Sequence, residues 1–189
     1  MKDLTIIKSN IKGYHHFKVR PHEDIEMDVE LDVDNSYDPS AMSVSMPKLD
    51  CIPLYLHEVV TREERGRDKE QRVRDTAGRQ VGRVPANLCK LFRKLLKNGE
   101  VIRVVCHSKS LPCLSEVPES QQKYRRNHFG KDKDRRGGGA VIPCCYVLKC
   151  RDQSYNKVKE FMHAALKRGD FQSTEEVLLE NEPSHSCPF

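Results

Sequence analysis

The chain contains no tryptophan, and aromatic residues make up only 6% of its 189 positions. Its core must therefore rest on aliphatic side chains, and 37% hydrophobic residues allow one modest core. No run of about 18 apolar residues occurs, which is the length that a membrane-spanning helix needs. The first residues, Met1–Lys8, lack the apolar core of a secretory signal. We expect an intracellular protein that does not associate with a membrane.

Paired cysteine motifs are also absent, although the chain has eight cysteines. Without a Cys-x-x-Cys motif, the close ligand pairs of a typical zinc site are missing. Disulfides need an oxidising compartment, which an intracellular protein lacks. We expect reduced thiols that act as small hydrophobic side chains, and a zinc site assembled from distant loops is the alternative. Cys144 and Cys145 are adjacent, so in a strand they point to opposite faces. We predict no metal and no cofactor.

Motifs for catalysis are missing as well. The chain has no Gly-x-x-x-x-Gly-Lys-Ser/Thr loop, which would cradle a nucleotide phosphate. His57-Glu58 begins like a zinc-protease helix, but Thr61 stands where the second histidine is needed. No cysteine lies in a recognisable Cys/His setting. We therefore predict that the chain is not an enzyme.

Charged residues are plentiful, at 32%, but unevenly distributed. The net charge is +5, yet residues 23–38 contain no lysine or arginine and eight acidic residues: Glu23, Asp24, Glu26, Asp28, Glu30, Asp32, Asp34 and Asp38. Without these eight negative charges, the rest of the chain carries +13. A polyanion could bind this protein, but not across the acidic segment.

Alternating hydrophobic and polar residues predict several strands. The clearest alternation runs from Ile25 to Val33, with acidic residues between the apolar ones, which predicts a half-buried strand with an acidic outer face. Further strands are expected over 14–19, 41–45, 80–84, 101–108 and 140–150. A turn-rich stretch, Asp34–Pro39, separates two of them.

Two helices are expected from periodic apolar residues. One begins after Pro85, has a leucine stripe, and ends at Asn98-Gly99. Lysine and arginine lie on its other face. The second spans Tyr155–Lys167, and capping-box spacing at Ser173 and Glu176 predicts a short last helix.

The fold class that follows is mainly β (α+β): a small OB-like β-barrel plugged by an amphipathic helix, with a C-terminal helical extension. We assign residues 1–150 to the barrel domain, 151–180 to the helical extension and 181–189 to a disordered tail. Two polar inserts interrupt the barrel at about 49–75 and 111–139. In the first, Cys51–Val60 can hold a strand, and Thr61–Asp75 is expected to be an exposed, mobile excursion.

Three motifs occur in order along the first half of the chain: Gly13-Tyr-His-His-Phe17, Asn35-Ser-Tyr-Asp38 before Pro-Ser-Ala-Met-Ser-Val44, and Gly78-Arg-Gln-Val-Gly-Arg-Val84. Together they resemble the HIRAN domain, a module of helicase-like transcription factor and related DNA-remodelling proteins. The resemblance covers about residues 6–108, and extends to 150 if the last strand belongs to the barrel. The chain departs from the family where His16 and Phe17 replace a tyrosine pair, and in its two inserts.

The resemblance implies an OB-like barrel that binds the 3′ end of single-stranded DNA. Tyr37 and Phe17 then offer faces for base stacking, and Asp38 accepts the terminal hydroxyl and repels a terminal phosphate. Arg83 binds a phosphate. The full set of expected nucleic-acid-binding residues is His15, His16, Phe17, Asn35, Tyr37, Asp38 and Arg83, and possible secondary phosphate contacts are Lys123, Arg125, Arg126, Arg135 and Arg136.

Each of these roles has an alternative. Asp38 precedes Pro39 and can simply cap a turn. Tyr37 can plug the end of the barrel, Phe17 can belong to the core, and Arg83 can be a solvated strand residue. Alternation along a strand would place one of His15 and His16 inside and the other outside.

The leading hypothesis is a nuclear, stand-alone HIRAN-like module that binds nucleic acid, preferably single-stranded DNA or its 3′ end, in DNA repair or remodelling. A helicase or another protein is a further expected partner, because the chain carries no motor of its own. The alternative is a protein-interaction adaptor that keeps the barrel and has lost DNA-end binding. The long inserts and the replaced tyrosine pair motivate this second hypothesis.

Overall fold

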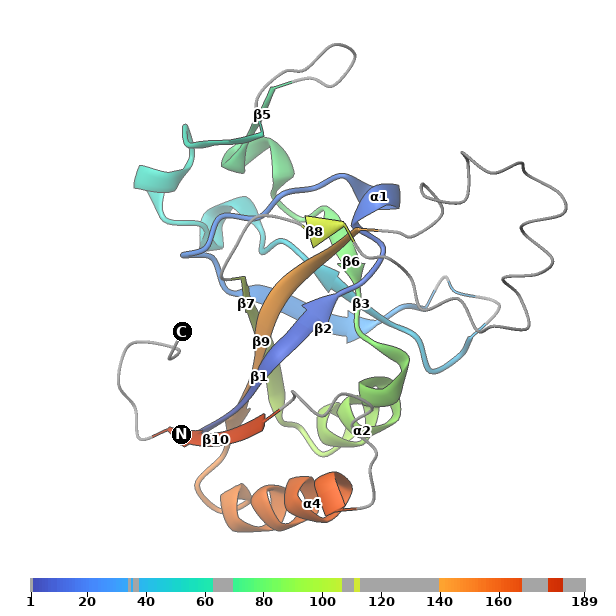
Figure 1. Cartoon of the computed structure of the whole chain (residues 1–189). Coiled ribbons are helices and arrows are strands. Elements are labelled where there is room, and N and C mark those ends of the chain that lie inside the picture. Colours follow the sequence, from blue (N-terminus) through green and yellow to red (C-terminus); the bar gives the residue numbers. More distant parts are fainter. Residues whose placement is uncertain are drawn as a thin grey trace, which may run out of the picture.

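One antiparallel sheet dominates the computed structural model, which describes residues 2–33, 35, 38–62, 70–106, 111–112, 140–167 and 177–181 (Figure 1). Its strands follow the order β10-β1-β9-β7-β2-β3-β6, and β8 pairs with β9 beside this path. Their bounds are β1 (Lys2–Ile11), β2 (Met27–Leu31), β3 (Met42–Ser45), β6 (Gln80–Arg83), β7 (Val101–Cys106), β8 (Leu111–Pro112), β9 (Ala140–Cys150) and β10 (Val177–Asn181). Together with its helices, the sheet confirms a mainly β, α+β architecture.

The two longest strands, β1 and β9, pair with each other. Their register places Ile6 opposite Tyr146 and Ile11 opposite Ile142, with a register shift between Ile6 and Ser9. Beyond the end of β1, Lys12 forms an antiparallel bridge with Arg83 of β6. Both backbone hydrogen bonds of this bridge form, at 2.9 and 2.8 Å. The first and last strands of the path β1-β9-β7-β2-β3-β6 therefore meet at this point.

Gly82 is the residue that permits this approach. A Cβ atom at Gly82 would lie 2.4 Å from Cγ2 of Ile11 and 2.5 Å from the carbonyl oxygen of Lys12. Any larger residue would push the two strands apart, because neither contact leaves room for a carbon atom. The Val-Gly pair in the third sequence motif thus has a direct structural reason.

The amphipathic helix α2 (Ala86–Lys97) buries its leucine stripe as expected. Pro85 precedes its first residue, and Asn98 ends it before Gly99, whose φ of 80° favours glycine. The Phe92 ring packs edge-on against the buried Tyr146 ring of β9, with ring centroids 5.1 Å apart. This contact joins the helix to the centre of the sheet.

The C-terminal region combines a predicted helix with an unpredicted strand. Helix α4 (Tyr155–Lys167) has the expected bounds and buries Val158, Met162 and Ala165. In contrast, β10 pairs with β1 from Asp3 to Ile7, so the extension is not helical throughout. The aliphatic run in β10 suits the open edge of β1 better than a capped helix. Residues 168–176, with the expected capping box, and most of the expected tail (182–189) lie outside the described residues.

The segment after Gly13 is a helical turn, α1 (Tyr14–Phe17), so the expected strand over 14–19 was wrong. Gly13 (φ 85°) and Lys18 (φ 54°) adopt left-handed conformations on either side of it. The N–H of Lys18 donates to the carbonyl oxygen of Tyr14 at 2.7 Å and closes the turn. Alternation therefore does not decide how His15 and His16 are oriented.

The alternating segment forms β2, but its last apolar residues do not face the core. Met27 and Val29 are buried, whereas Leu31 is 36% and Val33 is 86% exposed. The sheet pairing ends where Leu31 meets Met42, so Val33 already belongs to the loop. The strand is thus shorter than the hydrophobic pattern predicted.

The described part of the first insert, residues 49–62 and 70–75, has defined secondary structure. Residues 63–69, at the centre of the stretch expected to be a mobile excursion, lie outside the described residues. The described part contains short 3-10 helices and a two-stranded hairpin, with bounds η1 (Leu49–Cys51), η2 (Leu54–Leu56), β4 (Val60–Arg62), β5 (Gln71–Arg72) and η3 (Val73–Thr76). Ile52, Leu56 and Val73 are buried in the main hydrophobic core. These three apolar side chains fix the first insert on the sheet.

Six described cysteines carry free thiols. Cys51 is exposed, and the others are buried: Cys89, Cys106, Cys144, Cys145 and Cys150. Burial raises the pKa of the Cys106 thiol to about 12, so its reactive thiolate is disfavoured. Among the described residues, no helix has the length and apolar character needed to cross a bilayer.

Candidate functional site

The α1 turn carries the first predicted site residues. Tyr14 packs against the core and anchors the turn, while the Phe17 ring is half-buried and His16 is exposed. A Cβ atom at Gly13 would lie 3.5 Å from Cε2 of Phe17, so the ring lies close to the entry of the turn. The side chain of His15 lies outside the described residues. The turn therefore presents the partly exposed ring of Phe17 beside the exposed imidazole of His16.

Side-chain oxygens shape the loop between β2 and β3. Oδ1 of Asn35 accepts the N–H of Asp38 at 3.1 Å, and Oδ1 of Asp38 accepts the N–H of Ser40 at 2.8 Å. Both are local turn bonds of the kind that Asn and Asp favour, so the turn-capping role of Asp38 is confirmed. Asp38 is also exposed, so its carboxylate is accessible to solvent. Tyr37 lies outside the described residues.

Arg83 connects this loop to the α1 turn. Its Nε donates to Oδ2 of Asp32 at 3.0 Å, and its guanidinium carbon lies 6.0 Å from the centre of the Phe17 ring. The Asp32 side chain is 12% exposed and the Arg83 side chain 48% exposed. The guanidinium is therefore held through one nitrogen and remains half open to solvent beside an aromatic face.

Arg93 of α2 holds the other side of the loop. One terminal nitrogen donates to the carbonyl oxygen of Pro39 at 3.1 Å and lies 3.5 Å from the hydroxyl of Ser40. Burial raises the pKa of the nearby Cys89 thiol, and the negative charge of Asp38 adds to this rise. Lys94, also on the basic face of α2, lies over the Phe161 ring at 4.2 Å. Arg93 and Lys94 therefore make contacts within the protein, so the basic face is not only a solvated surface.

We name the surface formed by α1, the loop 32–41 and Arg83 the rim. The structure brings Phe17 and Arg83 together there and links Asn35 and Asp38 by a hydrogen bond. The N–H of Asn35 also donates to the carbonyl oxygen of Asp32 at 3.1 Å, which ties the loop to the partner of Arg83. The secondary phosphate contacts expected in the second insert, at Lys123, Arg125, Arg126, Arg135 and Arg136, lie outside the described residues.

Sequence reasoning missed two residues that hold the rim in place. Asp32 was counted only as one acid of a charged segment, although it orients Arg83. Arg93 was counted only among the lysine and arginine residues on the polar face of the helix, although it fixes the Pro39–Ser40 turn. No local pattern signals either contact, because the partners are 51 and 54 residues apart in the chain.

Two acidic residues in or just before β2 pair with cations from other strands of the sheet. Asp28 binds Arg103 of β7, and Glu26 accepts from Lys149 of β9 at 2.6 Å. These ion pairs reduce the local negative charge, and the repulsion expected along this flank is correspondingly weaker.

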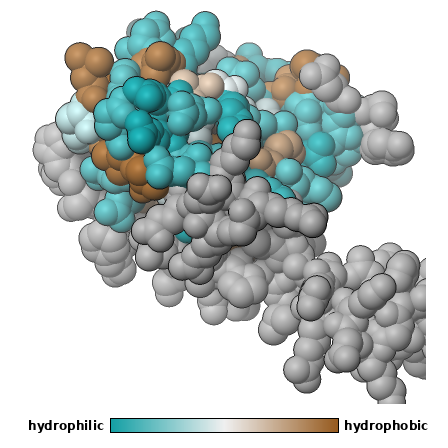
Figure 2. Space-filling view, turned by 90° about the horizontal axis from the view of Figure 1, so that it is seen from above, coloured by the Kyte–Doolittle hydropathy of each residue, from teal (hydrophilic) through white to brown (hydrophobic). Residues whose placement is uncertain are grey.

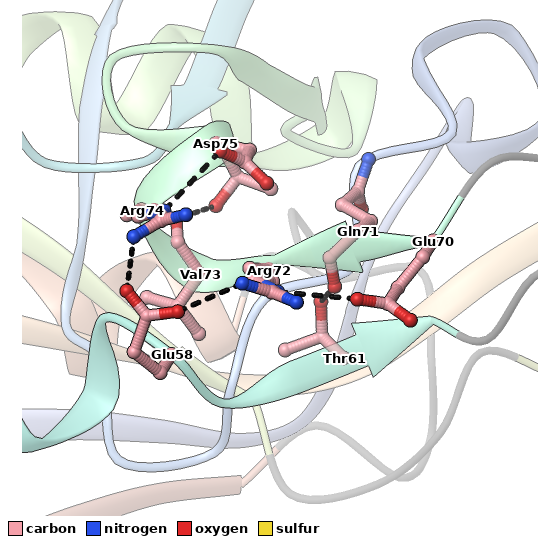
Figure 3. A network of polar contacts seen from close by, with 9 residues as sticks. Glu58, Thr61, Glu70, Gln71, Arg72, Val73, Arg74 and Asp75 are labelled. Atoms are coloured by element: carbon pink, nitrogen blue, oxygen red, sulfur yellow. Dashed lines mark hydrogen bonds and ion pairs between the residues drawn. The ribbon is translucent and has the colours of Figure 1, made fainter.

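Ion pairs also cover one face of the first insert (Figure 3). Glu58 binds both Arg72, at 2.9 Å, and Arg74. Glu70 binds Arg72 at 3.1 Å, and Asp75 lies 3.7 Å from Arg74. The hydrogen bond that Arg72 donates to Glu70 raises the pKa of Arg72. Three carboxylates thus share two guanidinium groups.

Exposed apolar side chains gather in the same insert. Of the six large hydrophobic residues that are exposed in the described part, four belong to it: Leu49 (47%), Leu54 (84%), Tyr55 (72%) and Val60 (41%). Figure 2 looks onto the end of the molecule that carries β5 in Figure 1, and it shows brown hydrophobic side chains among teal ones. The backbone of η1 and η2 is hydrogen-bonded, so these side chains project from an ordered segment.

Comparison with known proteins adds no assignment, because no family model, no curated protein and no solved structure matches the chain. The described residues also contain no cluster of three or more His, Cys, Asp or Glu side chains that could hold a metal ion. What the rim offers chemically is an oriented cation, an aromatic face and an accessible carboxylate on neighbouring segments. These groups can bind an anion that carries a flat ring.

Proposed function

We propose that the chain is a HIRAN-like module that binds nucleic acid, with single-stranded DNA and its 3′ end as the preferred ligand. It acts in DNA repair or remodelling in the nucleus, together with a helicase or another partner that supplies the motor. The module binds without catalysing a reaction.

The proposed architecture is an OB-like barrel closed between β1 and β6. The bridge between Lys12 and Arg83 supports closure, because it joins the two ends of the strand path. Gly82 supports it too, since a side chain there would prevent the approach. The helix α2, which packs on Tyr146, takes the place of the plug.

The observation that carries the function is the position of the Arg83 guanidinium, oriented by Asp32 and standing beside the Phe17 ring. A strand end needs a donor for phosphate and a ring for base stacking, and these are the two groups that meet here. Asp38 supplies the third requirement, an acceptor for the terminal hydroxyl. Its exposed carboxylate would repel an added terminal phosphate.

The direct test compares labelled single-stranded oligonucleotides that end in a 3′-hydroxyl or a 3′-phosphate, with binding followed by fluorescence anisotropy. We expect tighter binding of the hydroxyl end and an affinity that falls as salt rises. Equal binding of both ends would contradict end recognition. An absence of any salt-dependent binding would contradict the proposed function as a whole.

The informative variant is Asp38→Asn, because asparagine keeps the oxygen that accepts from Ser40 and removes the negative charge. We expect this variant to lose its preference between the two ends by gaining affinity for the phosphorylated one. Asp50→Asn is the matched control, since it removes the charge of another exposed aspartate, in η1. It should keep the wild-type preference.

A protein-interaction adaptor is the second candidate function, and the exposed apolar residues of the first insert favour it. Leu54 and Tyr55 are the most exposed of them and adjacent in the chain. A partner retained after nuclease treatment and lost in Leu54→Asp would support this function. A partner that nuclease removes, or that Leu54→Asp still binds, would count against it.

A further inference from the structure

Gln71 is one of few buried polar residues in the described part of the chain, at 6% exposed. It lies in β5 of the first insert, where successive side chains point to opposite faces. Arg72 faces the ion pairs, while the side chain of Gln71 turns away from them (Figure 3). A buried amide is costly unless its donor and its acceptor both find partners.

Both ends of the Gln71 amide bind the backbone that follows the α1 turn. Oε1 accepts the N–H of Arg20 at 2.9 Å, and Nε2 lies 3.4 Å from the carbonyl oxygen of Lys18, to which it donates. The Gln71 side chain therefore forms hydrogen bonds with these two backbone groups, as the backbone of an adjacent strand would. It connects segments that are 51 and 53 residues apart in the chain.

The segment that Gln71 holds is conformationally demanding. Lys18 is the one non-glycine residue with a positive φ in the described part, at 54°. An L-residue pays an energetic cost in this conformation, so surrounding contacts must maintain it. Lys18 also closes the α1 turn through its bond to Tyr14. Its geometry therefore sets where His16 and Phe17 lie.

We infer that Gln71 is a positioning residue of the rim, and that the first insert acts as a brace for the α1 turn. Without its two hydrogen bonds, the turn relaxes and Phe17 no longer stands beside Arg83. Gln71 itself does not contact the ligand. This inference rests on the proposed function, in that it assigns the α1 turn to the nucleic-acid site.

The variant that tests it is Gln71→Met, which keeps the length of the side chain and removes both hydrogen bonds. Nuclear magnetic resonance of the free protein should show shifted signals for His16, Phe17 and the amide of Arg20. The affinity for a single-stranded oligonucleotide should fall about fivefold to tenfold, the factor that one buried hydrogen bond is worth. Gln71→Glu keeps the acceptor for Arg20 and should give an intermediate result.

Arg72→Met is the matched control, because it changes the neighbouring residue on the opposite face of β5. Arg72→Met should leave the signals of α1 unshifted. It should keep the affinity for the oligonucleotide within twofold of the wild-type value. Thermal melts of both variants identify any general loss of folding. If Gln71→Met does not fold, the comparison of Gln71→Glu with Arg72→Met decides.

The brace and the proposed function are contradicted by different results. If the signals of α1 change as little in Gln71→Met as in Arg72→Met, the brace is overturned, whatever the ligand is. Shifted α1 signals in Gln71→Met, together with a wild-type protein that binds no oligonucleotide, would retain the brace and reject the proposed function. Wild-type binding that is unchanged by Gln71→Met would reject the positioning role.

Discussion

The rim and the first insert both use arginine and carboxylate groups, but in different proportions. In the insert, Arg72 and Arg74 are shared among three carboxylates, so their positive charges are neutralised by ion pairs. At the rim, Arg83 donates through Nε to Asp32 and stands beside the Phe17 ring. The difference shows that ion pairing can serve either to neutralise a surface or to orient a cation toward a ligand.

The largest expected effect concerns the support beneath the rim. Gly82→Ala places a methyl group 2.5 Å from the carbonyl oxygen of Lys12, so the bridge to Arg83 must open. We expect the free energy of unfolding to fall by about 3 kcal/mol. Urea denaturation measures this change.

Gly78→Ala is the control variant for the urea denaturation of Gly82→Ala. Gly78 has a φ of 68°, and no atom lies within 4 Å of the place that a methyl group would take, so only backbone strain opposes alanine there. We expect a loss of about 1 kcal/mol. Equal losses for the two variants would contradict the close approach of β1 and β6.

The next effect concerns buried cysteine thiols in the hydrophobic core that the rim and the first insert share. Burial raises the pKa of Cys106 to about 12 and that of Cys150 to about 11, from a usual value of 9.0. The unfolded chain therefore releases these protons first as the pH rises above about 9, and the folded state loses stability in that range. Between pH 8 and pH 10 we expect a loss of about 1 kcal/mol for each thiol. Denaturation at the two pH values should show a smaller loss in Cys106→Ala, and an equal loss would contradict the prediction.

Removing the partner of Arg83 should have a smaller effect on stability. Asp32→Asn deletes the charge of a side chain that is 12% exposed, while Arg83 stays half in solvent. We expect the free energy of unfolding to fall by about 1 kcal/mol, because solvent screens the exposed partner. The signal of the Arg83 Nε–H should shift in nuclear magnetic resonance spectra. An unshifted signal would mean that Asp32 does not orient the guanidinium.

The smallest effect is expected in the first insert. Glu58→Gln removes the carboxylate that joins Arg72 and Arg74, but all three side chains are exposed. Exposed ion pairs contribute little, so we expect a melting temperature within about 2 °C of wild type. A much larger decrease would show that this ion-pair cluster, rather than Ile52, Leu56 and Val73, holds the insert in place.

Local patterns predicted the parts of the fold that local physics controls. The bounds of α4 and β9 follow from apolar periodicity, and α2 follows from its leucine stripe between Pro85 and Asn98-Gly99. The α1 turn was missed because its apolar residues are compatible with either a strand or a helix. The positive φ of Lys18 decides between them, and no sequence pattern marks it.

The candidate site was predicted in part for a similar reason. The motif that contains Asn35 and Asp38 indicates a turn, and the structure has that turn. The roles of Asp32, Gln71 and Arg93 depend on contacts across more than 50 residues, which a single sequence does not reveal. The first insert was expected to be mobile because its charges are dense, and among its described residues Glu58 pairs with Arg72 and Arg74.

The most direct test of the central claim is a titration of the ¹⁵N-labelled protein with a short single-stranded oligonucleotide that ends in a 3′-hydroxyl. If the rim binds nucleic acid, the largest signal changes will come from Phe17, Asp38 and Arg83, while Leu54 and Tyr55 stay unchanged. No change at the rim, or changes confined to the first insert, would contradict the account.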